Sequence, residues 1–305
     1  MADRFYCGLG DRGVLEVGGA DRVAFLQGLV SNDVTRASPQ RALYAALLTP
    51  QGKYLHDFFI IATEDALLVD AEAARLDDLR RRLALYRLRS KVTLADASDR
   101  YGVIAAFGDG AAQAFGLDEA TGTARAWEGG VAAVDPRLAG LGVRLLLPRD
   151  KGTAAIETAG FAPAHTAAYD RLRLSLGVPD GSRDLAIDKS ILLEAGFDEL
   201  NGVDWQKGCY IGQELTARTR YRGLIKKRLM PVAVDGPLPP PDTIIRLGTA
   251  EAGEMRSGCD GLGLALLRLE AVEDAARDGT PLTAGPARLT PLRPAWMRNE
   301  RDASP

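Results

Sequence analysis

The octapeptide KGCYIGQE, residues 207–214, combines the residue types of this chain that are best suited to chemistry. The ammonium group of Lys207 favours the thiolate form of Cys209, and a thiolate attacks electrophiles and binds soft metals. Glycine allows a positive φ and a close approach of the backbone to a ligand. The alternative is a structural turn that carries a small buried thiol. The flexible and polar neighbours of the thiol are Gly208, Gly212, Gln213 and Glu214.

Length and composition narrow the class of protein. A chain of 305 residues predicts two or three domains. Its 46% hydrophobic and 26% charged residues are typical of a soluble globular protein. A net charge of −3 argues against direct binding of nucleic acid, which calls for a basic face. No apolar stretch approaches the roughly 20 residues that span a membrane, so no membrane partner is expected. The first residues resemble neither a signal nor a transit peptide, which predicts a cytoplasmic location.

The cysteines exclude two kinds of site. Cys7, Cys209 and Cys259 are odd in number and far apart, so a disulfide framework is not expected. There is no CxxC motif, and the chain has two histidines. A structural zinc site or a self-contained iron–sulfur cluster needs about four soft ligands. We therefore expect no metal site formed by this chain alone.

Hydrophobic periodicity and turn residues predict the elements that must position the octapeptide. A helix follows Asp21 and ends near Val30, and tight turns separate three strands of an antiparallel meander. From Met230 the composition changes to short β segments rich in proline and glycine, which predicts a small β-barrel or sandwich after a boundary near Gly223. The expected strands are 13–17, 42–49, 54–61, 66–69, 92–95, 103–107, 131–134, 143–147 and 215–221, and the expected further helices are 72–89 and 166–176.

Segments along nearly the whole chain share a resemblance to one protein superfamily. They are FLQG (25–28) with Asn32-Asp33, LTPQGK (48–53), DPR (135–137), LGVRLL (141–146), Arg173 with GVP (177–179), NGV (201–203), KGCYIGQELTAR (207–218) and GLALL (263–267). Together they resemble the folate-binding aminomethyltransferase superfamily typified by the glycine-cleavage T-protein. Within it, the chain is most similar to the YgfZ-type proteins and their mitochondrial iron–sulfur assembly relatives.

This resemblance implies an α+β fold with three lobes around a central folate-sized cavity and a C-terminal β-barrel. Residues 1–222 would form the aminomethyltransferase-like folate-binding region, with two lobes around the cavity. Residues 223–305 would form the barrel domain. Composition predicts the barrel independently, whereas the cavity is implied by the resemblance alone.

The function implied is that of the assembly-factor branch, because that branch has the cysteine octapeptide and the T-proteins lack it. Its members take part in making or maintaining [4Fe–4S] clusters in a manner linked to tetrahydrofolate, including the clusters of radical enzymes that thiolate tRNA. The partners implied are iron–sulfur scaffold or carrier proteins and cluster-dependent client enzymes. Cys209 can lend one ligand to a cluster held by such a partner, or act by thiol exchange, and both roles are open.

The resemblance also assigns the site residues. Lys207 lowers the pKa of Cys209 or contacts a folate carboxylate, and Tyr210 stacks on the pterin or covers apolar surface. Arg173 meets folate or the octapeptide carboxylate, or it caps the end of its helix. Arg137 is expected to fix a loop. Arg218 pairs with Glu214 or guides the anionic tail of folate. Gln213 and Glu214 bond the pterin or fix the loop. The remaining candidates for contact with folate are Gly208 and Gly212.

The alternative function is tetrahydrofolate-dependent aminomethyl or one-carbon transfer. T-proteins carry paired aspartates near the second meander strand, and this chain has His56-Asp57 there. Asp57 would orient and stabilise a developing cationic amine if it faces the cavity. A third interpretation is a non-catalytic folate-binding protein whose thiol senses oxidants.

Overall fold

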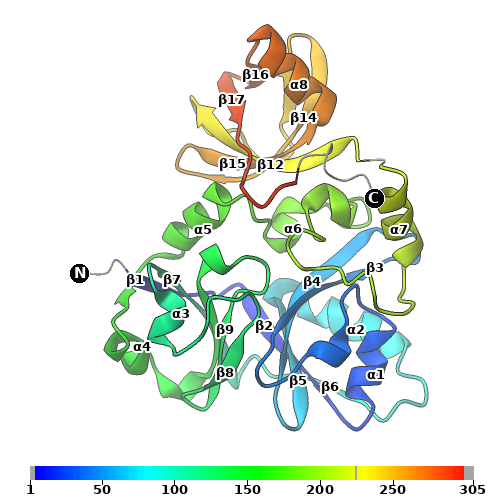
Figure 1. Cartoon of the computed structure of the whole chain (residues 1–305), viewed down its shortest axis with the longest axis vertical. Coiled ribbons are helices and arrows are strands. Elements are labelled where there is room, and N and C mark those ends of the chain that lie inside the picture. Colours follow the sequence, from blue (N-terminus) through cyan, green and yellow to red (C-terminus); the bar gives the residue numbers. More distant parts are fainter. Residues whose placement is uncertain (1–3, 224, 299–305) are drawn as a thin grey trace. The chain divides into compact units, whose positions relative to one another are not determined.

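The computed structural model describes residues 4–223 and 225–298, which divide into two compact units. The first unit takes the chain up to Leu48, then Leu55–Tyr169 and Leu200–Ile211. The second takes Thr49–Tyr54, Asp170–Glu199 and the chain from Gly212 onward. Figure 1 shows the path of the chain through both units, and the octapeptide crosses from the first to the second.

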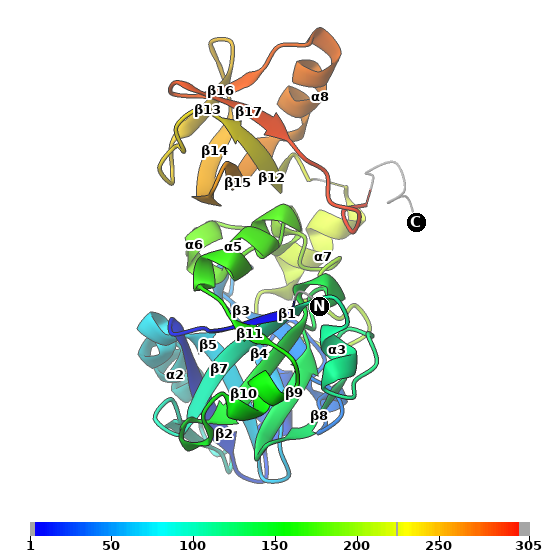
Figure 2. The ribbon, with the colours of Figure 1, turned by 90° about the vertical axis from the view of Figure 1, so that its left-hand side faces the viewer.

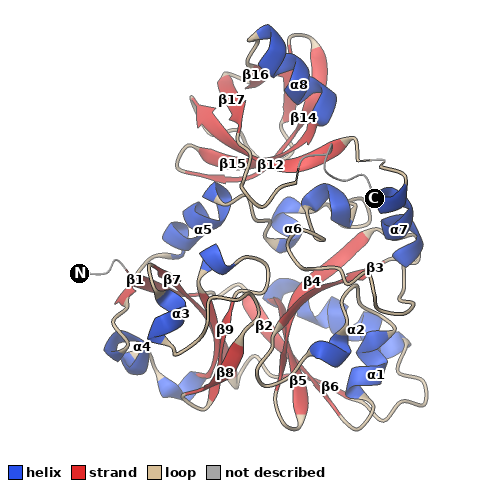
Figure 3. Ribbon diagram, viewed as in Figure 1, coloured by secondary structure: helices blue, strands red, loops and turns tan. Residues whose placement is uncertain are grey.

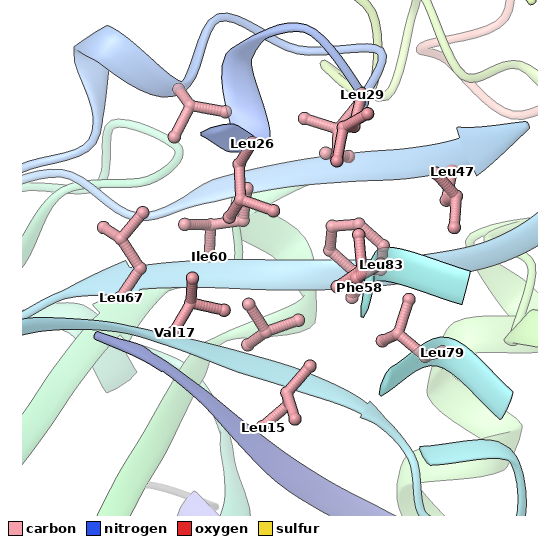
Figure 4. Packing of buried hydrophobic residues seen from close by; sticks show 14 of the residues in the cluster. Leu15, Val17, Leu26, Leu29, Leu47, Phe58, Ile60, Leu67, Leu79 and Leu83 are labelled. Carbon is pink, nitrogen blue, oxygen red and sulfur yellow. The ribbon is translucent and has the colours of Figure 1, made fainter. Parts of the chain in front are cut away.

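A five-stranded sheet in the first unit contains the predicted meander. Its order is β3-β4-β5-β2-β6, and successive strands pair antiparallel where their register is defined. The helices α1 and α2 pack on one of its faces through Leu26, Leu79 and Leu83 (Figure 4). The elements are β2 (Arg12–Gly18), α1 (Arg22–Gln27), β3 (Leu43–Leu48), β4 (Tyr54–Ala62), β5 (Ala66–Glu72), α2 (Leu76–Leu85) and β6 (Thr93–Asp96).

The strand β4 is buried along its whole length. Its successive side chains point to opposite faces of the sheet, and each face packs against a different core. Phe58 and Ile60 point to the core that α1 and α2 cover (Figure 4). Ile61 points to the opposite face, where a second apolar cluster joins it to residues of the other sheet of this unit. Asp57 lies four residues before Ile61, so both side chains are on the same face of the sheet. The carboxylate of Asp57 therefore points away from the helices α1 and α2.

The second sheet of the first unit has six strands in the order β11-β1-β7-β10-β9-β8 (Figure 2). The short helices α3 and α4 contribute Ala112 and Ile156 to the core of this sheet. All of its pairings are antiparallel except that of β1 with β11. The elements are β1 (Arg4–Gly8), β7 (Tyr101–Gly108), α3 (Ala111–Ala114), β8 (Ala124–Trp127), β9 (Gly130–Val134), β10 (Val143–Pro148), α4 (Ala154–Thr158) and β11 (Ala162–Pro163).

The second unit contains a closed six-stranded barrel in the order β12-β15-β14-β13-β16-β17, with α8 packed on it (Figure 3). Three further helices precede the barrel in the sequence. The elements are α5 (Thr166–Ser175), α6 (Gly181–Asp184), α7 (Gln213–Tyr221), β12 (Lys227–Asp235), β13 (Ile244–Leu247), β14 (Ala250–Cys259), β15 (Leu262–Arg268), α8 (Leu269–Asp278), β16 (Leu282–Ala284) and β17 (Ala287–Pro291).

The barrel begins at Lys227, close to the predicted boundary. The two compact units, however, are not separated at residues 222–223. Asp170–Glu199 belongs with the barrel because buried polar contacts join them. Asp184 of α6 accepts hydrogen bonds from the backbone N–H and the hydroxyl of Ser257 in β14, at 3.0 and 2.5 Å. Contacts between residues so distant in sequence leave no compositional signal.

The strand predicted for residues 215–221 is wrong, because this segment lies in the helix α7. Thr216 and Thr219 are buried three residues apart, and Glu214 forms an ion pair with Arg218 one turn further on. These spacings fit a helix, since positions three and four apart share a face. Over seven residues, alternation does not separate a strand from a helix.

Candidate thiol site in the octapeptide

Lys207 anchors the octapeptide to the loop that follows α1. Its ammonium donates hydrogen bonds to the backbone carbonyl oxygens of Gln27 at 2.8 Å, Val30 at 2.6 Å and Asn32 at 2.7 Å. An ammonium has three N–H donors, so this set engages all of them. Carbonyls that follow a helix favour a cation at this position. Burial lowers the pKa of Lys207 to about 8.

These contacts give Lys207 a positioning role that the sequence did not predict. Three carbonyl oxygens already engage its donors, so the described contacts leave no N–H of Lys207 for Cys209 or a folate carboxylate. The predicted effects of Lys207 on the pKa of Cys209 and on a folate carboxylate stay predictions. Either effect would have to come from the positive charge of Lys207 and not from a hydrogen bond.

The chain before Lys207 is held to the same loop by further polar contacts. The carboxylate of Asp204 accepts the backbone N–H groups of Gln206 and Lys207 at 2.7 and 3.0 Å, and it pairs with Arg36 at 2.9 Å. The Asn32 amide donates to the carbonyl oxygen of Asn201 at 2.8 Å. The sequence segments at 32–33 and 201–203, which share the family resemblance, therefore meet and fix the start of the octapeptide.

Cys209 lies exposed between two held residues. Tyr210 is buried, with the Lys207 ammonium 5.1 Å from its ring centroid, and Ile211 packs against the core of the five-stranded sheet. This arrangement fixes the backbone on both sides of the thiol and leaves the sulfur accessible. Buried Tyr210 fits the predicted alternative of covering apolar surface.

The other two thiols lie in environments that disfavour the thiolate. Cys7 is buried in β1, and burial raises its pKa to about 11. Burial and the neighbouring carboxylate of Asp260 raise the pKa of Cys259. Cys209 is therefore the exposed thiol of the three.

The two glycines of the octapeptide differ in why they are tolerated. Gly212 has φ of +80° in the left-handed region and precedes the first residue of α7, which fits the predicted turn. Gly208 does not have a positive φ, and a Cβ added to it would meet nothing within 4 Å. The turn therefore favours glycine at position 212 and not at position 208, and a close approach of Gly208 to a ligand stays a prediction.

The remaining octapeptide side chains belong to the second unit. Glu214 and Arg218 form an exposed ion pair one helical turn apart on α7, which is one of the two predicted roles of Arg218. Gln213 is the first residue of that helix. Their contacts with folate, like those of Gly208, Gly212 and Tyr210, stay predictions.

Arg173 holds the helical segment and the barrel of the second unit together. Its guanidinium bonds the carboxylates of Asp170 at 2.6 Å and Asp184 at 2.7 Å, and the hydroxyl of Ser257 at 2.7 Å. The residue is 3% exposed. This geometry gives Arg173 a structural role, and its role toward folate stays a prediction.

Asp57 lies inside the first unit. It is 3% exposed, and its carboxylate accepts a hydrogen bond from the hydroxyl of Tyr44 at 2.8 Å. Its neighbour His56 points to the other face and bonds Asp78 at 3.0 Å. Burial lowers the pKa of His56 to about 4, so its imidazole is neutral at pH 7. The role of Asp57 as the catalytic carboxylate of a transferase stays a prediction.

A buried layer of charged groups near Asp57 escaped the sequence reasoning. Asp70 is fully buried and accepts from Arg12 and Arg144, both at 2.7 Å, and Arg144 lies 3.8 Å over the ring of Phe59. Arg137 pairs with Asp135 at 2.9 Å, which agrees with its predicted structural role. In the sequence, the one sign of this buried layer was the charged Arg144 within the apolar segment LGVRLL.

The cavity beside Tyr44 does not suit folate. Its volume is about 160 Å³, whereas pockets for ligands of that size are typically about 300–1,000 Å³. Asn32, Arg36, Asn201 and Asp204 line it, and all four are engaged in the contacts above. Among residues 4–223 and 225–298, no three or more His, Cys, Asp or Glu side chains form a group that could hold a metal ion.

The fold is that of the T-protein class, with a C-terminal barrel. The crystal structure of glycine cleavage system aminomethyltransferase T from Bartonella henselae matches with a TM-score of 0.75 over 96% of this chain and 85% of that chain, at 15% identity. The family model for the CAF17 C-terminal β-barrel domain matches residues 226–299. Both findings confirm the predicted α+β fold and its barrel.

Sequence comparison then identifies the family. The human mitochondrial iron–sulfur cluster assembly factor IBA57 is 35% identical over 284 residues, which cover 87% of this chain and 78% of that protein. The mouse protein of the same name is 34% identical with the same coverage. The Mycosarcoma maydis homologue is 33% identical over 86% of this chain and 73% of its own length. The chain belongs to the IBA57 family of iron–sulfur cluster assembly factors.

The expectation of a cytoplasmic location is contradicted, because the relatives above are named as mitochondrial proteins. The composition of the first residues was insufficient ground, since a targeting signal is read separately from the folded residues that carry the match. Within the described residues, no helix is long and apolar enough to cross a membrane.

Proposed function

We propose that this protein is an accessory factor in the assembly or repair of [4Fe–4S] clusters, and that Cys209 supplies one thiolate to a cluster held by a partner protein. Membership of the IBA57 family supports the role in cluster assembly. The observation that carries the use of Cys209 is its exposure between anchored Lys207 and buried Tyr210.

The chemistry is a ligand exchange on the cluster, which is the cargo of the reaction. The Cys209 thiolate forms an iron–sulfur bond while a solvent molecule or a partner ligand leaves the same iron, and the thiol proton passes to water. No electron is transferred. A [4Fe–4S] cluster takes four thiolate ligands, so one thiol of this chain requires that a partner supply the others. Thiol exchange with a partner is the other role open to Cys209.

The proposed partners follow from this division of ligands. A scaffold or carrier protein would hold the cluster before transfer, and cluster-dependent enzymes, including radical enzymes that thiolate tRNA, would receive it. The anchoring of Lys207 supports such a hand-over, because a fixed backbone presents the sulfur in one place and reduces the ordering cost of docking.

Tetrahydrofolate belongs to the proposal as the cofactor that the family resemblance implies. Its candidate contacts are Arg173, Tyr210 and the octapeptide residues Gly208, Gly212, Gln213, Glu214 and Arg218. The cations do not favour a folate carboxylate in the described contacts, since carboxylates and a hydroxyl engage Arg173 and Glu214 pairs with Arg218.

The test uses cells that lack this protein and receive the wild type, Cys209→Ala or the matched control Cys259→Ala. A [4Fe–4S] dehydratase is assayed beside a cluster-free enzyme, after immunoblots establish equal accumulation of the three proteins. We expect the wild type and Cys259→Ala to restore the dehydratase and Cys209→Ala to fail. Restoration by Cys209→Ala would exclude the thiol from the function, and an unaffected dehydratase in the deletion strain would exclude the assembly role.

A further inference from the structure

The second unit encloses a cavity of about 1110 Å³ that has no part in the proposed thiol chemistry. Its walls come from the segment around α6 and from β12, β14 and β15 of the barrel. Leu238, the run Pro239–Pro241 and Leu266 give it an apolar side. The volume leaves room for an organic molecule, since it slightly exceeds the range of about 300–1,000 Å³ that is typical of ligand pockets.

Three lysines line this cavity, and each comes from a different part of the chain: Lys53, Lys189 and Lys227. Lys53 ends the LTPQGK turn, which the sequence analysis singled out. That turn is fixed, because a Cβ on Gly52 would lie 2.6 Å from both the Gly212 carbonyl oxygen and Leu215 Cβ. The close packing of Gly52 against the start of α7 therefore places the lysine that follows it.

The adjacent cations Lys226, Lys227 and Arg228 have three different environments. Arg228 is buried and pairs with Glu199 at 2.6 Å. Lys226 is exposed and does not line the cavity, whereas Lys227 is half-buried and does. A solvated strand end, which is the default interpretation of such a run, accounts for Lys226 alone.

Most of the described charged side chains of the cavity wall that form no ion pair are lysines. Arg256 is engaged by Asp242 and Glu254, and Arg183 by Asp170 and Asp180. Among the described residues, no carboxylate forms an ion pair with Lys53, Lys189 or Lys227. Glu194 is the remaining acid of the wall; burial raises its pKa, against the effect of Lys227 and Lys53. Three ammonium groups thus stand against one carboxylate.

We propose that this cavity binds a compact organic polyanion, a polycarboxylate or a phosphate ester, through the ammonium groups of Lys53, Lys189 and Lys227. Lys53 and Lys227 are partly buried, whereas Lys189 is exposed. Partly buried cations attract an anion more strongly than exposed ones do, because the surrounding dielectric is lower. The proline-rich wall gives the carbon skeleton of such a ligand an apolar surface to contact. Arg256 also lines the cavity, and its Nε–H is buried and has no acceptor among the described residues. This N–H is a further hydrogen-bond donor of the cavity wall.

The test is isothermal titration calorimetry of the full chain with citrate and, separately, with pyrophosphate at low ionic strength. We expect one of the two probes to bind the wild type with a dissociation constant below about 1 mM, which corresponds to about −4 kcal/mol. The tighter probe distinguishes a carboxylate from a phosphate ligand. If neither probe binds, the proposal is overturned.

Variants separate a site from a general effect of charge. Lys53→Met and Lys227→Met should each weaken binding at least about tenfold, and Glu194→Gln should tighten it. Lys226→Met is the matched control, because it removes the same charge from the neighbouring residue outside the cavity. An equal loss in Lys226→Met and Lys227→Met would show non-specific attraction and reject the site. Thermal unfolding with and without the probe checks that each variant folds and that the ligand stabilises the native state.

Discussion

The ammonium of Lys207 lies 2.6 Å from the backbone carbonyl oxygen of Val30, although 176 residues separate them in the chain. Two further carbonyl oxygens, of Gln27 and Asn32, complete its hydrogen bonds. The residue two places before the exposed thiol is therefore fixed to the loop after α1. The position of Cys209 depends on this contact, and the contact can be tested directly.

Substitution of Lys207 by Met should destabilise the protein by about 2–3 kcal/mol, because three carbonyl groups lose their donor. Burial lowers the pKa of Lys207 in the native state to about 8, from an ordinary 10.5. Between these values the unfolded chain binds more protons than the native one, so stability rises with pH. The free energy of unfolding of the wild type, relative to Lys207→Met, should therefore increase from pH 8 to 10.5.

The measurement is urea unfolding of the wild type and Lys207→Met across this pH range. Subtracting one free energy of unfolding from the other removes the contribution of groups that titrate alike in both proteins. A difference that falls or stays constant with pH would contradict the assigned pKa.

The octapeptide glycines should respond differently to alanine. Gly212→Ala forces a side chain into a left-handed conformation and should cost about 1 kcal/mol or more, measured by thermal unfolding. Gly208→Ala should leave the unfolding temperature unchanged, because its Cβ would enter open space. If Gly208→Ala still fails to restore the dehydratase in cells, the added methyl group obstructs a partner. Strong destabilisation by Gly208→Ala would contradict the described backbone.

Alkylation should distinguish the three thiols. Iodoacetamide at pH 8 should modify Cys209 first, because the residue is exposed. Cys7 should react only in urea, since it is buried and its pKa of about 11 keeps it protonated. Peptide mass spectrometry over time gives the three rates, and Cys209→Ala identifies the fast one. Fast labelling of Cys7 in the native protein would be incompatible with its burial in β1.

Asp57 provides the test of the transferase alternative. Tyr44→Phe removes the donor to this carboxylate and should cost about 1–2 kcal/mol. Asp57→Asn keeps an acceptor for Tyr44 but loses its charge. If Asp57 is structural, both variants should restore the dehydratase wherever they accumulate to the wild-type level. Turnover of an aminomethyl donor by the wild type that is abolished in Asp57→Asn would instead establish the transferase.

Asp70 should be a major determinant of stability in the first unit. It is fully buried between Arg12 and Arg144, so Asp70→Asn removes the carboxylate charge that faces two buried guanidinium groups. We expect a loss of about 3–5 kcal/mol. The exposed pair of Arg100 with Glu16 is the control, and Glu16→Gln should cost less than about 1 kcal/mol. Chemical unfolding of both variants compares them, and equal losses would show that burial is not the cause.

The sequence by itself determined the meander, the helix Thr166–Ser175, the barrel and the octapeptide as the candidate site. Periodicity and turn residues are local properties, and the motif is contiguous, so both can be recognised without tertiary contacts. The helix α7 was predicted as a strand, because a segment this short fits both the period of two residues of a strand and the period of 3.6 residues of a helix. Its true state depends on Gly212 and on the burial of Thr216 and Thr219.

Only the tertiary structure decided what the candidate residues contact. Lys207 and Val30, Arg173 and Ser257, and Asp57 and Tyr44 bond across distances in sequence that no pattern reports. A charged residue has the same appearance in a sequence whether its partner is a ligand or a buried carbonyl. Burial and hydrogen-bond geometry arise only when distant segments pack, and here they separated the exposed thiol of Cys209 from the side chains that hold it in place.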